Sequence, residues 1–574
     1  MNTIIELKDA IKKHTSDQDK IISPEETVKN FEEKIKSQNL DILQETKRID
    51  NGRLGIPVFF SVCGEDAKAV TGTAKQMGKG ATPEQAKASA VMELAERFSF
   101  FSFKNKSENF FTDTFKNVEK DAIPFEMIMQ SVHDTGDMAI NKKVFENLPL
   151  QWTKAYNLSK KKEVLVPFNW FYMINEFNGP SAGNCTEEAI CQGICEIMER
   201  HTSSIISHSD MDVPAVDPAT ADDPAVVEML KNYKDEGINV YISDFSLNTG
   251  IPTIGVLAYD PDTFPVMSEI VWTAGTAPDP QKALSRALTE TAQLAGDFNT
   301  RSNYIASGLP KFTDLSKADF IINATETKSI SELPDISDNN IKIEVENALD
   351  AISAMGMEVL LINTMHEGLQ IPAFYTIIPG AHFRERAVEA SVGMFSARLI
   401  TETYNPAEAI LKLREMDALL TDKYYTQFYL GLSYLSLENP ETALTHFEKA
   451  MTLDPSELNL PDIISYTGVC LKDTGQYEKA LDVLAKGALI DDQRTDIFNL
   501  MGFCNFMLKN HETAIENFKK VIEIDPTSAI DYANIASNYR DLGNTEMAIK
   551  YYKMTLSIDP TIDFARDNLE KLSK

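Results

Sequence analysis

The sequence predicts an α+β domain followed by an all-α repeat domain. Three observations lead to this prediction: the carboxy-terminal third repeats with a period near 34 residues, the first 400 residues alternate helical patterns with short β-branched runs, and a glutamate-rich loop–helix motif recurs three times in that first part. A chain of 574 residues is too long for one ordinary core. We therefore expect two domains, at residues 1–405 and 406–574.

Composition and charge narrow the classes of function. Apolar residues make up 43% of the chain and charged residues 25%, as in ordinary globular proteins. The formal charge of -31 argues against direct nucleic-acid binding and against an anionic membrane surface, because both need a basic partner. The chain has no run of roughly 18 apolar residues and no apolar leader. We expect a cytoplasmic protein with no membrane association.

The six cysteines are too sparse for a disulfide framework in a chain of this length. Cys191 and Cys195 lie four residues apart and would share a helical face. No histidine or further cysteine stands beside them at ligand spacing, which favours apolar packing of these two thiols over metal binding.

The repeats occupy about residues 424–560. Four aligned segments share small residues in two columns twelve positions apart, namely Gly431, Gly468, Gly502 and Ala536, then Ala443, Ala480, Ala514 and Ala548. A large side chain, such as Phe447 or Phe518, follows the alanine by four positions. These segments resemble tetratricopeptide repeats, in which paired helices touch through small residues. We expect a capping helix within 562–574 and protein–protein contacts through the repeats.

Three helix–strand–strand units are expected before the repeats. The helical patterns are "EETVKNFEEKIKSQ", "PAVVEMLKNYKDE" and "IEVENALDAISAM". The strand pairs that follow are "NLDIL" with "LGIPVFFSV", "GINVYISDF" with "GIPTIGVLAY", and "GMEVLLINT" with "LQIPAFYTII". Proline suits a strand entry because it need not donate a ladder hydrogen bond there. Ile-Pro entries also occur by chance, but their recurrence favours related units.

A small-residue loop precedes a helix with paired acids in "GKGATPEQAKASAVMELAER" and in "SAGNCTEEAICQGICEIMER". A third copy, "AGTAPDPQKALSRALTETAQ", pairs a glutamate with a glutamine. We expect helix N-caps at Thr82, Thr186 and Asp279, with prolines at the first helical position after Thr82 and Asp279. Like charges one turn apart cost about a few tenths of a kcal/mol in a helix, so a cation, solvent or arginine must offset them.

The recurrence of these acids favours a metal–nucleotide site. A capped helix start offers N–H groups to phosphate, and paired carboxylates suit a hard cation such as Mg²⁺. Positive charge for phosphate oxygens would come from Lys79, Arg97, Arg200 and Arg286. A single ExxER is more often a solvated charged face, whereas three related copies favour a site. No GxGxxG or GxxxxGK[ST] motif stands in the required context, so any nucleotide site is of another kind.

At these residues the sequence resembles the YcaO family of ATP-dependent enzymes. The matching elements are GKG followed by Sx3Ex2ER, then "NGPSAGNCTEEAICQGICEIMER", then "RALTETAQ", within about residues 20–400. The resemblance implies three related α/β subdomains around ATP and Mg²⁺. It also implies that ATP phosphorylates a backbone amide oxygen of a peptide or protein, that a nucleophile adds to the amide carbon, and that phosphate leaves with the oxygen.

The resemblance assigns site residues by motif position. Metal ligands would be Glu93, Glu96, Glu196, Glu199 and Glu290, and nucleotide contacts would come from Ser89, Arg97, Asn184, Arg200 and Gln293. Lys20 and Thr27 are added near the phosphates on an amino-terminal Lys-x6-Ser/Thr spacing, although a helix-flanking lysine and an ordinary helical threonine account for them equally well. No residue needs to act as a covalent nucleophile, so none is assigned a catalytic role.

Departures from the family pattern bear on which phosphate contacts and which reaction we expect. Pro180 and Ser181 replace the usual Leu and Ala, and the arginine two residues after Gln293 is missing, which makes Arg301 a substitute for its phosphate contact. The last residues lack the proline-rich tail of azoline-forming cyclodehydratases, and no leader-peptide-binding domain is recognisable. The repeats make the chain look closer to stand-alone members linked to ribosomal-protein β-methylthiolation.

Two function classes follow. The first is an enzyme that hydrolyses ATP to ADP and phosphate while activating an amide for a sulfur nucleophile, in thioamidation or as an accessory to methylthiolation, with azoline formation as the alternative reaction. Its partners would be a peptide or protein substrate, a sulfur-donor or accessory protein, and a second copy of the chain in a homodimer. The second class is a noncatalytic scaffold whose nucleotide fold steadies repeats that recruit partners.

Overall fold

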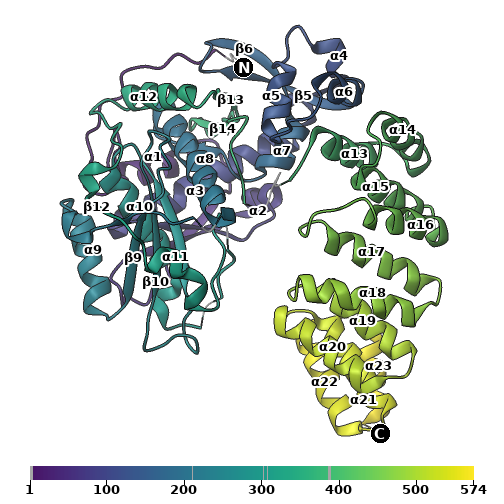
Figure 1. Ribbon diagram of the computed structural model, residues 1–574. Coiled ribbons are helices and arrows are strands. Elements are labelled where there is room, and N and C mark those ends of the chain that lie inside the picture. The colour runs from purple at the N-terminus through teal and green to yellow at the C-terminus, as the bar shows by residue number, and fades with distance from the viewer. Residues whose placement is uncertain (1–3, 210, 302, 307, 385–388, 574) are drawn as a thin grey trace. The chain divides into compact units, whose positions relative to one another are not determined.

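The computed structural model describes residues 4–209, 211–301, 303–306, 308–384 and 389–573. Figure 1 shows a mixed α/β part followed by stacked helices, which confirms the predicted fold class. Unit 1 comprises residues 1–136 and 149–391, and unit 2 comprises residues 137–148 and 392–574. Among the described helices, none combines the length and the apolar composition that crossing a membrane requires.

The first layer of unit 1 is an antiparallel sheet in the order β1 (Leu43–Arg48), β2 (Val58–Cys63), β3 (Lys75–Lys79). Helix α3 (Pro83–Asn105) packs on β2 and β3, and α1 (Pro24–Ser37) packs on α3. The run at 39–42, expected to be strand, is not strand. Its backbone carbonyls instead accept hydrogen bonds from the start of α2 (Glu65–Thr71), because Gly64 N–H donates to Ile42 O at 2.7 Å and Asp66 N–H donates to Asp41 O at 3.0 Å.

The second layer is a sheet in the order β4 (Phe111–Thr114), β5 (Pro149–Asn157), β13 (Leu360–Asn363), β14 (Ala373–Ile377), β7 (Pro180–Ala182), with β6 (Lys162–Pro167) paired to β5. Helix α8 (Thr186–Ser209) packs on β7 and β14, and α12 (Ile341–Ala354) packs on α8. Strands from opposite ends of the unit 1 sequence therefore share one sheet. Helix α8 begins at Thr186, so the expected N-cap position falls one residue earlier.

The third layer is a sheet in the order β11 (Val271–Thr276), β10 (Thr253–Tyr259), β9 (Asn239–Asp244), β8 (Ala215–Val216), β12 (Thr327–Lys328), in which β8 and β12 are parallel. Helices α9 (Pro224–Asp235) and α10 (Pro280–Ala295) cover one face. Ile254 and Val256 point into that core, whereas Leu257 packs with Phe245 and Trp272 on the other face.

The remaining described elements of unit 1 are short. They are η1 (Ser107–Asn109), α2 (Glu65–Thr71), α4 (Phe115–Val118), α5 (Phe125–Ser131), α7 (Phe168–Asn175), η2 (Pro218–Thr220), η3 (Gly296–Phe298), η4 (Leu315–Ala318), α11 (Asp319–Ile322) and η5 (Ile330–Glu332). The predicted Ile-Pro entries are confirmed, because Pro57, Pro252 and Pro372 each stand immediately before a strand.

The three layers close into a ring. Helix α3 packs on its own sheet and also contacts β7 and β14 of the second sheet. Helix α8 packs on the second sheet and contacts β11 of the third, and α10 packs on the third sheet and contacts β3 of the first. This cyclic arrangement brings the three motif helices together, although their motifs lie about a hundred residues apart in the chain.

Unit 2 is a stack of helices, and Figure 1 shows those within residues 392–573 in chain order from green to yellow. Its elements are α6 (Met138–Phe145), α13 (Val392–Thr403), α14 (Pro406–Leu419), α15 (Tyr424–Leu435), α16 (Pro440–Met451), α17 (Leu460–Asp473), α18 (Tyr477–Ile490), α19 (Thr495–Met507), α20 (His511–Ile524), α21 (Ala529–Asp541), α22 (Thr545–Ile558) and α23 (Asp563–Leu572). Helix α23 is the expected capping helix. Helices α13 and α6 pack with the first helices of this unit, so unit 2 begins before residue 406 and includes a segment from residues 137–148.

Candidate functional site

A cleft in unit 1 collects side chains from the amino-terminal segment and from all three motif helices. Its lining includes the predicted residues Lys20, Thr27, Lys79, Ser89, Glu93, Glu96, Asn184 and Arg286. A neighbouring cavity shares Lys20, Glu188, Gln192 and Arg286 with this cleft. A third cavity shares Thr27 and Asn184 with it, on the side of α1. The cleft is therefore continuous with space on both sides.

Local sequence explains how the cleft is built. Thr82 caps α3 by accepting from Gln85 N–H at 3.2 Å, and Asp279 caps α10 by accepting from Gln281 N–H at 2.7 Å, as predicted. Gly78 lets β3 lie directly on α3, since a Cβ at Gly78 would stand 2.0 Å from the backbone nitrogen of Ala90. The close contact places Lys79 at the end of β3 beside the motif helices.

Lys79 lies where charges from the three motif helices meet. Its ammonium pairs with Glu290 of α10. Burial and the neighbouring Arg286 lower the pKa of Lys79 to about 8, although 24% of the side chain is exposed. Glu199 of α8 and Glu93 of α3 act in the opposite direction on the pKa of Lys79. Lys79 therefore contacts Glu290 of α10 and lies within electrostatic range of Glu199 of α8 and Glu93 of α3.

A second group of charges joins α3 and α8. Arg97 Nε donates to Glu93 Oε1 at 3.0 Å and lies 3.5 Å from Glu96 Oε1. Burial raises the pKa of Glu96 well above its ordinary value, and Glu93 adds to this rise. Burial also raises the pKa of Glu196, although Arg200 and Arg97 oppose the rise. Three carboxyl groups thus share two guanidinium groups, and a bound cation would favour the ionised form of Glu96 and Glu196.

The motif helices also contact the strand that precedes the next motif helix. Arg97 of α3 donates to Phe177 O just before β7 at 3.2 Å, and Glu199 of α8 accepts from Thr276 N–H at the end of β11 at 3.2 Å. Glu290 of α10 meets Lys79 at the end of β3. These side-chain contacts follow the same cyclic order as the packing of the three layers. They orient the acids of α8 and α10 toward the strand ends.

Two arginines keep unused hydrogen-bond donors. Arg286 Nη1 donates to Gln192 Oε1 at 2.8 Å, while the buried Nε atoms of Arg286 and Arg200 have no hydrogen-bond partner among the described residues. Buried donors of this kind are uncommon, and an anionic ligand would satisfy them. Gln85, which also lines the cleft, leaves its buried Oε1 without a described partner.

The residues present fit a magnesium–nucleotide complex. Across the described ranges, no three His, Cys, Asp or Glu side chains are already arranged to hold a metal ion. Mg²⁺ commonly takes one or two carboxylates and completes its shell with phosphate and water oxygens, so a preformed cage of protein ligands is not required. The lysine and arginines suit the phosphates, and the surplus carboxylates suit the cation.

Sequence reasoning missed two buried carboxylates near the cleft. Glu188 accepts from Asn184 N–H at 3.0 Å and from Ile21 N–H at 2.8 Å. Asp17 accepts from Ala81 N–H at 2.7 Å and from Ser285 Oγ–H at 3.0 Å. Burial raises the pKa of Asp17, and these two hydrogen bonds partly offset the rise. Neither acid belongs to an ExxER or ExxQ pattern, so only its burial distinguishes it.

Several predicted residues are not among those that line the cleft: Arg97, Glu196, Glu199, Arg200, Glu290, Gln293 and Arg301. Gln293 stands on α10, one turn after Glu290, but is not among the residues that line the cleft. Arg301, expected to replace a missing arginine, instead directs its Nε to Met267 Sδ at 2.8 Å, and its backbone bonds to the same residue. Cys191 and Cys195 line the neighbouring cavity, where both are free thiols.

Comparison with known proteins agrees with this geometry. A family model described as YcaO cyclodehydratase, ATP- and Mg²⁺-binding, matches residues 77–382, which is more than half of the chain. A tetratricopeptide-repeat model matches residues 426–457, 495–528 and 532–562. ATP and Mg²⁺ are thus the cofactors of the family whose motifs form the cleft, and the repeat region is confirmed.

Individual relatives cover different shares of the chain. An uncharacterized protein of Methanothermobacter thermautotrophicus is 28% identical over 62% of this chain and 94% of its own length. The ribosomal protein S12 methylthiotransferase accessory factor YcaO of Escherichia coli is 30% identical over 38% of this chain and 40% of its own length. A solved heterocyclase, in complex with substrate and cofactor, aligns with a TM-score of 0.52 at 19% identity, over 66% of this chain and 54% of that chain.

The family match covers the second and third sheets and the three motif helices, and it includes Lys79, Glu93, Glu199 and Glu290. The chain belongs to the YcaO family.

Proposed function

We propose that this protein binds ATP with Mg²⁺ in the unit 1 cleft and activates a backbone amide of a peptide or protein by O-phosphorylation. The observation that carries the proposal is the position of Lys79, which pairs with Glu290, lines the cleft with Glu93 and is within electrostatic range of Glu199. Bound ATP supplies a γ-phosphoryl group that turns the amide oxygen into a leaving group. The chain's own residues supply position and charge, which are the main requirements for phosphoryl transfer.

Each group of residues has a distinct part. Lys79, Arg200 and Arg286 hold phosphate oxygens, and the unpartnered arginine Nε atoms direct donors to them. Metal ligands come from Glu93, Glu96, Glu196, Glu199 and Glu290. Ser89, Asn184, Lys20 and Thr27 complete the nucleotide side of the cleft. Arg97 holds Glu93 and Glu96 in place, since its guanidinium lies within ion-pair distance of both carboxylates.

Sulfur is the proposed nucleophile, so the product is a thioamide or an intermediate of methylthiolation. The support is the name of the E. coli relative, an accessory factor of a methylthiotransferase. The repeats of unit 2 would contact the substrate protein, a sulfur-donor protein or a second copy of this chain. Azoline formation is the alternative reaction, supported by the cyclodehydratase name of the family model.

Nucleotide binding tests the site before the substrate is known. Calorimetric titration with the non-hydrolysable analogue AMPPNP and Mg²⁺ is expected to show one site per chain. Glu93→Gln and Glu199→Gln should each weaken metal-dependent binding by at least about tenfold, because each removes a carboxylate charge without changing size. Glu84→Gln is the matched control, since Glu84 lies exposed in the first turn of α3. Unchanged affinity in both cleft variants contradicts the proposed site.

The reaction itself is tested by mass spectrometry of peptides co-expressed with the wild-type protein. Exchange of one oxygen for sulfur supports thioamidation, and loss of water supports azoline formation. Release of ADP and phosphate should require the peptide that becomes modified, and this release should be lost in the Glu199→Gln variant. A protein that binds partners through unit 2 but binds no nucleotide would instead be a scaffold.

A further inference from the structure

The amino-terminal segment at residues 8–21, here called the strap, crosses three elements of unit 1 before α1 begins. Its backbone N–H groups bond to α8, where Lys8 donates to Glu187 Oε1 at 2.6 Å and Ile21 donates to Glu188 Oε1 at 2.8 Å. Ala10 N–H donates to Asn340 Oδ1 at 2.8 Å, at the start of α12. The strap also supplies Gln18, Asp19 and Lys20 to the lining of the cleft and of the neighbouring cavity.

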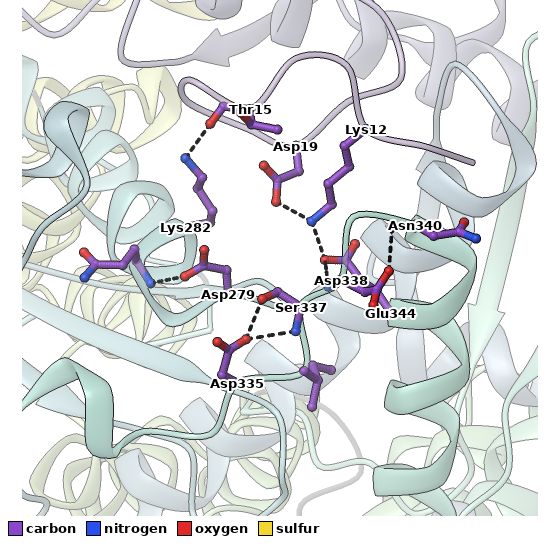
Figure 2. A network of polar contacts seen from close by, with 12 residues as sticks. Lys12, Thr15, Asp19, Asp279, Lys282, Asp335, Ser337, Asp338, Asn340 and Glu344 are labelled. Carbon is purple, nitrogen blue, oxygen red and sulfur yellow. Dashed lines mark hydrogen bonds and ion pairs between the residues drawn. The ribbon is translucent and has the colours of Figure 1, made fainter. Parts of the chain in front are cut away.

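A buried ion-pair cluster fastens the middle of the strap. Figure 2 shows the Lys12 ammonium between Asp19 of the strap and Glu344 of α12, at 2.6 and 2.5 Å. Lys282 of α10 donates to Thr15 O at 2.8 Å and pairs with Asp223 at 2.6 Å. Each partner of Lys12 is mostly enclosed, so separating this cluster would leave charges without their counter-ions.

The strap forms a closed loop with Asp17 at its tip. Lys20 N–H donates to His14 O at 2.8 Å, and His14 N–H donates back to Lys20 O at 3.0 Å. The Asp17 side chain, 2% exposed, accepts from Ala81 N–H beside the GKG loop and from Ser285 Oγ–H of α10. Ala81 is two residues from Lys79, and Ser285 adjoins Arg286. The Asp17 carboxylate therefore connects the loop that follows Lys79 with the helix that carries Arg286.

The strap is attached by polar contacts more than by apolar burial. Ala10 is buried, but Ile11 is 46% exposed. Segments that bury little apolar surface open at lower free energy than the core of the same protein. Opening the strap would remove Lys20 from the cleft and release both contacts of Asp17. A ligand that needs these groups binds the closed form better and so favours closure.

We propose that the strap and the magnesium–nucleotide complex bind unit 1 cooperatively, with Asp17 as the positioning residue that sets the GKG loop against α10. This inference rests on the proposed function, since it assumes a nucleotide in the cleft. Beyond the proposed function, it holds that nucleotide binding controls closure of the strap over unit 1. Asp17 acts through the groups it holds and touches no phosphate.

Limited trypsin digestion of the full-length wild-type protein tests this coupling, because Lys8, Lys12, Lys13 and Lys20 offer cleavage sites along the strap. Saturating AMPPNP with Mg²⁺ should slow cleavage at these lysines by roughly tenfold, within the usual range of coupling between two sites. Mass spectrometry of the shortened chains measures each rate. Equal rates with and without bound nucleotide would overturn the inference, and this experiment needs no variant to fold.

Variants of the tip separate positioning from general stability. The Asp17→Ala variant should bind AMPPNP about tenfold more weakly, and without nucleotide trypsin should cleave its strap faster than that of the wild type. Asp17→Asn should retain both properties, since an amide oxygen can still accept from Ala81 N–H and the Ser285 hydroxyl can turn to accept from the amide. Ser16→Ala is the control, because Ser16 is exposed in the same loop. Full nucleotide affinity in Asp17→Ala would overturn the inference.

The two proposals fail in different ways. A wild-type protein that binds no AMPPNP in calorimetry overturns the proposed function, and the strap inference falls with it. A wild-type protein that binds AMPPNP but digests at the same rate when saturated overturns the strap inference alone.

Discussion

Glycines show how differently the two units are built. In unit 1, a Cβ at Gly78 would meet the Ala90 backbone at 2.0 Å, and one at Gly275 would meet Ala283 O at 2.4 Å. In unit 2, a Cβ at Gly502 would meet a ring carbon of Phe518 at 2.7 Å, and one at Gly468 would meet a methyl of Leu484 at 2.6 Å. At these two glycines unit 1 therefore packs backbone on backbone, whereas at Gly502 and Gly468 unit 2 packs small residues against movable side chains.

The same contrast applies to charge. The contacts of Lys79 and Glu199 in unit 1 join residues far apart in the sequence, and they leave carboxylates and arginines in excess of their protein partners. The helices of unit 2 contact mainly their neighbours in the chain, through pairs such as Gly502 and Phe518. We infer that unit 1 holds a site whose geometry depends on the whole ring, while unit 2 is a modular surface.

The largest expected effect comes from Phe518→Ala in unit 2. Phe518 is 2% exposed, so its removal should cost the repeat unit about 3–5 kcal/mol of unfolding free energy. Chemical denaturation followed by circular dichroism measures this loss. Phe503→Ala is the control, because Phe503 is 39% exposed on the adjoining helix. AMPPNP affinity should not change, and a fall of tenfold or more would break the separation of the two units.

Gly78→Ala tests the tighter packing of unit 1. The added methyl cannot fit beside Ala90 without moving β3 from α3, so the cost in stability should be about 1–3 kcal/mol. Lys79 would move with the strand, and AMPPNP binding should weaken by at least about tenfold. Gly368→Ala is the matched control in unit 1, since its Cβ would meet the nearest atom at an ordinary 3.4 Å. Equal losses of stability and of AMPPNP affinity in Gly78→Ala and Gly368→Ala would argue against close backbone contact between β3 and α3 as the cause.

Gly502→Ala sharpens the same comparison from the other unit. The Phe518 ring can shift away from a new methyl group, and alanine restricts the unfolded chain, so the net cost should stay below about 1.5 kcal/mol. Thermal denaturation of Gly78→Ala and Gly502→Ala side by side provides the measurement. A larger loss for Gly502→Ala than for Gly78→Ala would reverse the contrast drawn between the units.

The smallest expected effect is a pH dependence that comes from a buried histidine of unit 1. Burial, with His133 and His201 nearby, lowers the pKa of His382 to about 4, and the rings of His133 and His382 stack 3.7 Å apart. The unfolded chain therefore takes up this proton more readily than the folded one, and stability falls as the pH drops from about 6.5 toward 4. His382→Gln should reduce the fall in melting temperature between pH 7 and pH 5 by roughly 2–4 °C. An unchanged slope would contradict this assignment.

Local patterns in the sequence were enough to place the motif helices, their caps at Thr82 and Asp279, the Ile-Pro strand entries and the repeats. The resemblance to the family assigned Lys20, Thr27 and Ser89 to the nucleotide by motif position, and all three line the cleft. The strap was not predicted, since Asp17 and Lys12 have no periodicity and depend on partners such as Ser285 and Glu344. For the same reason, nothing local assigns residues 137–148 to unit 2.

The central claim is that three helices from different layers hold one magnesium–nucleotide complex. Hydrogen exchange of the full chain, with and without saturating AMPPNP and Mg²⁺, tests it most directly. The account predicts slower exchange together in the loops and first turns of α3, α8 and α10, with the helices of unit 2 unchanged. Protection of only one of these three helices, or of none while the analogue is bound, would contradict it.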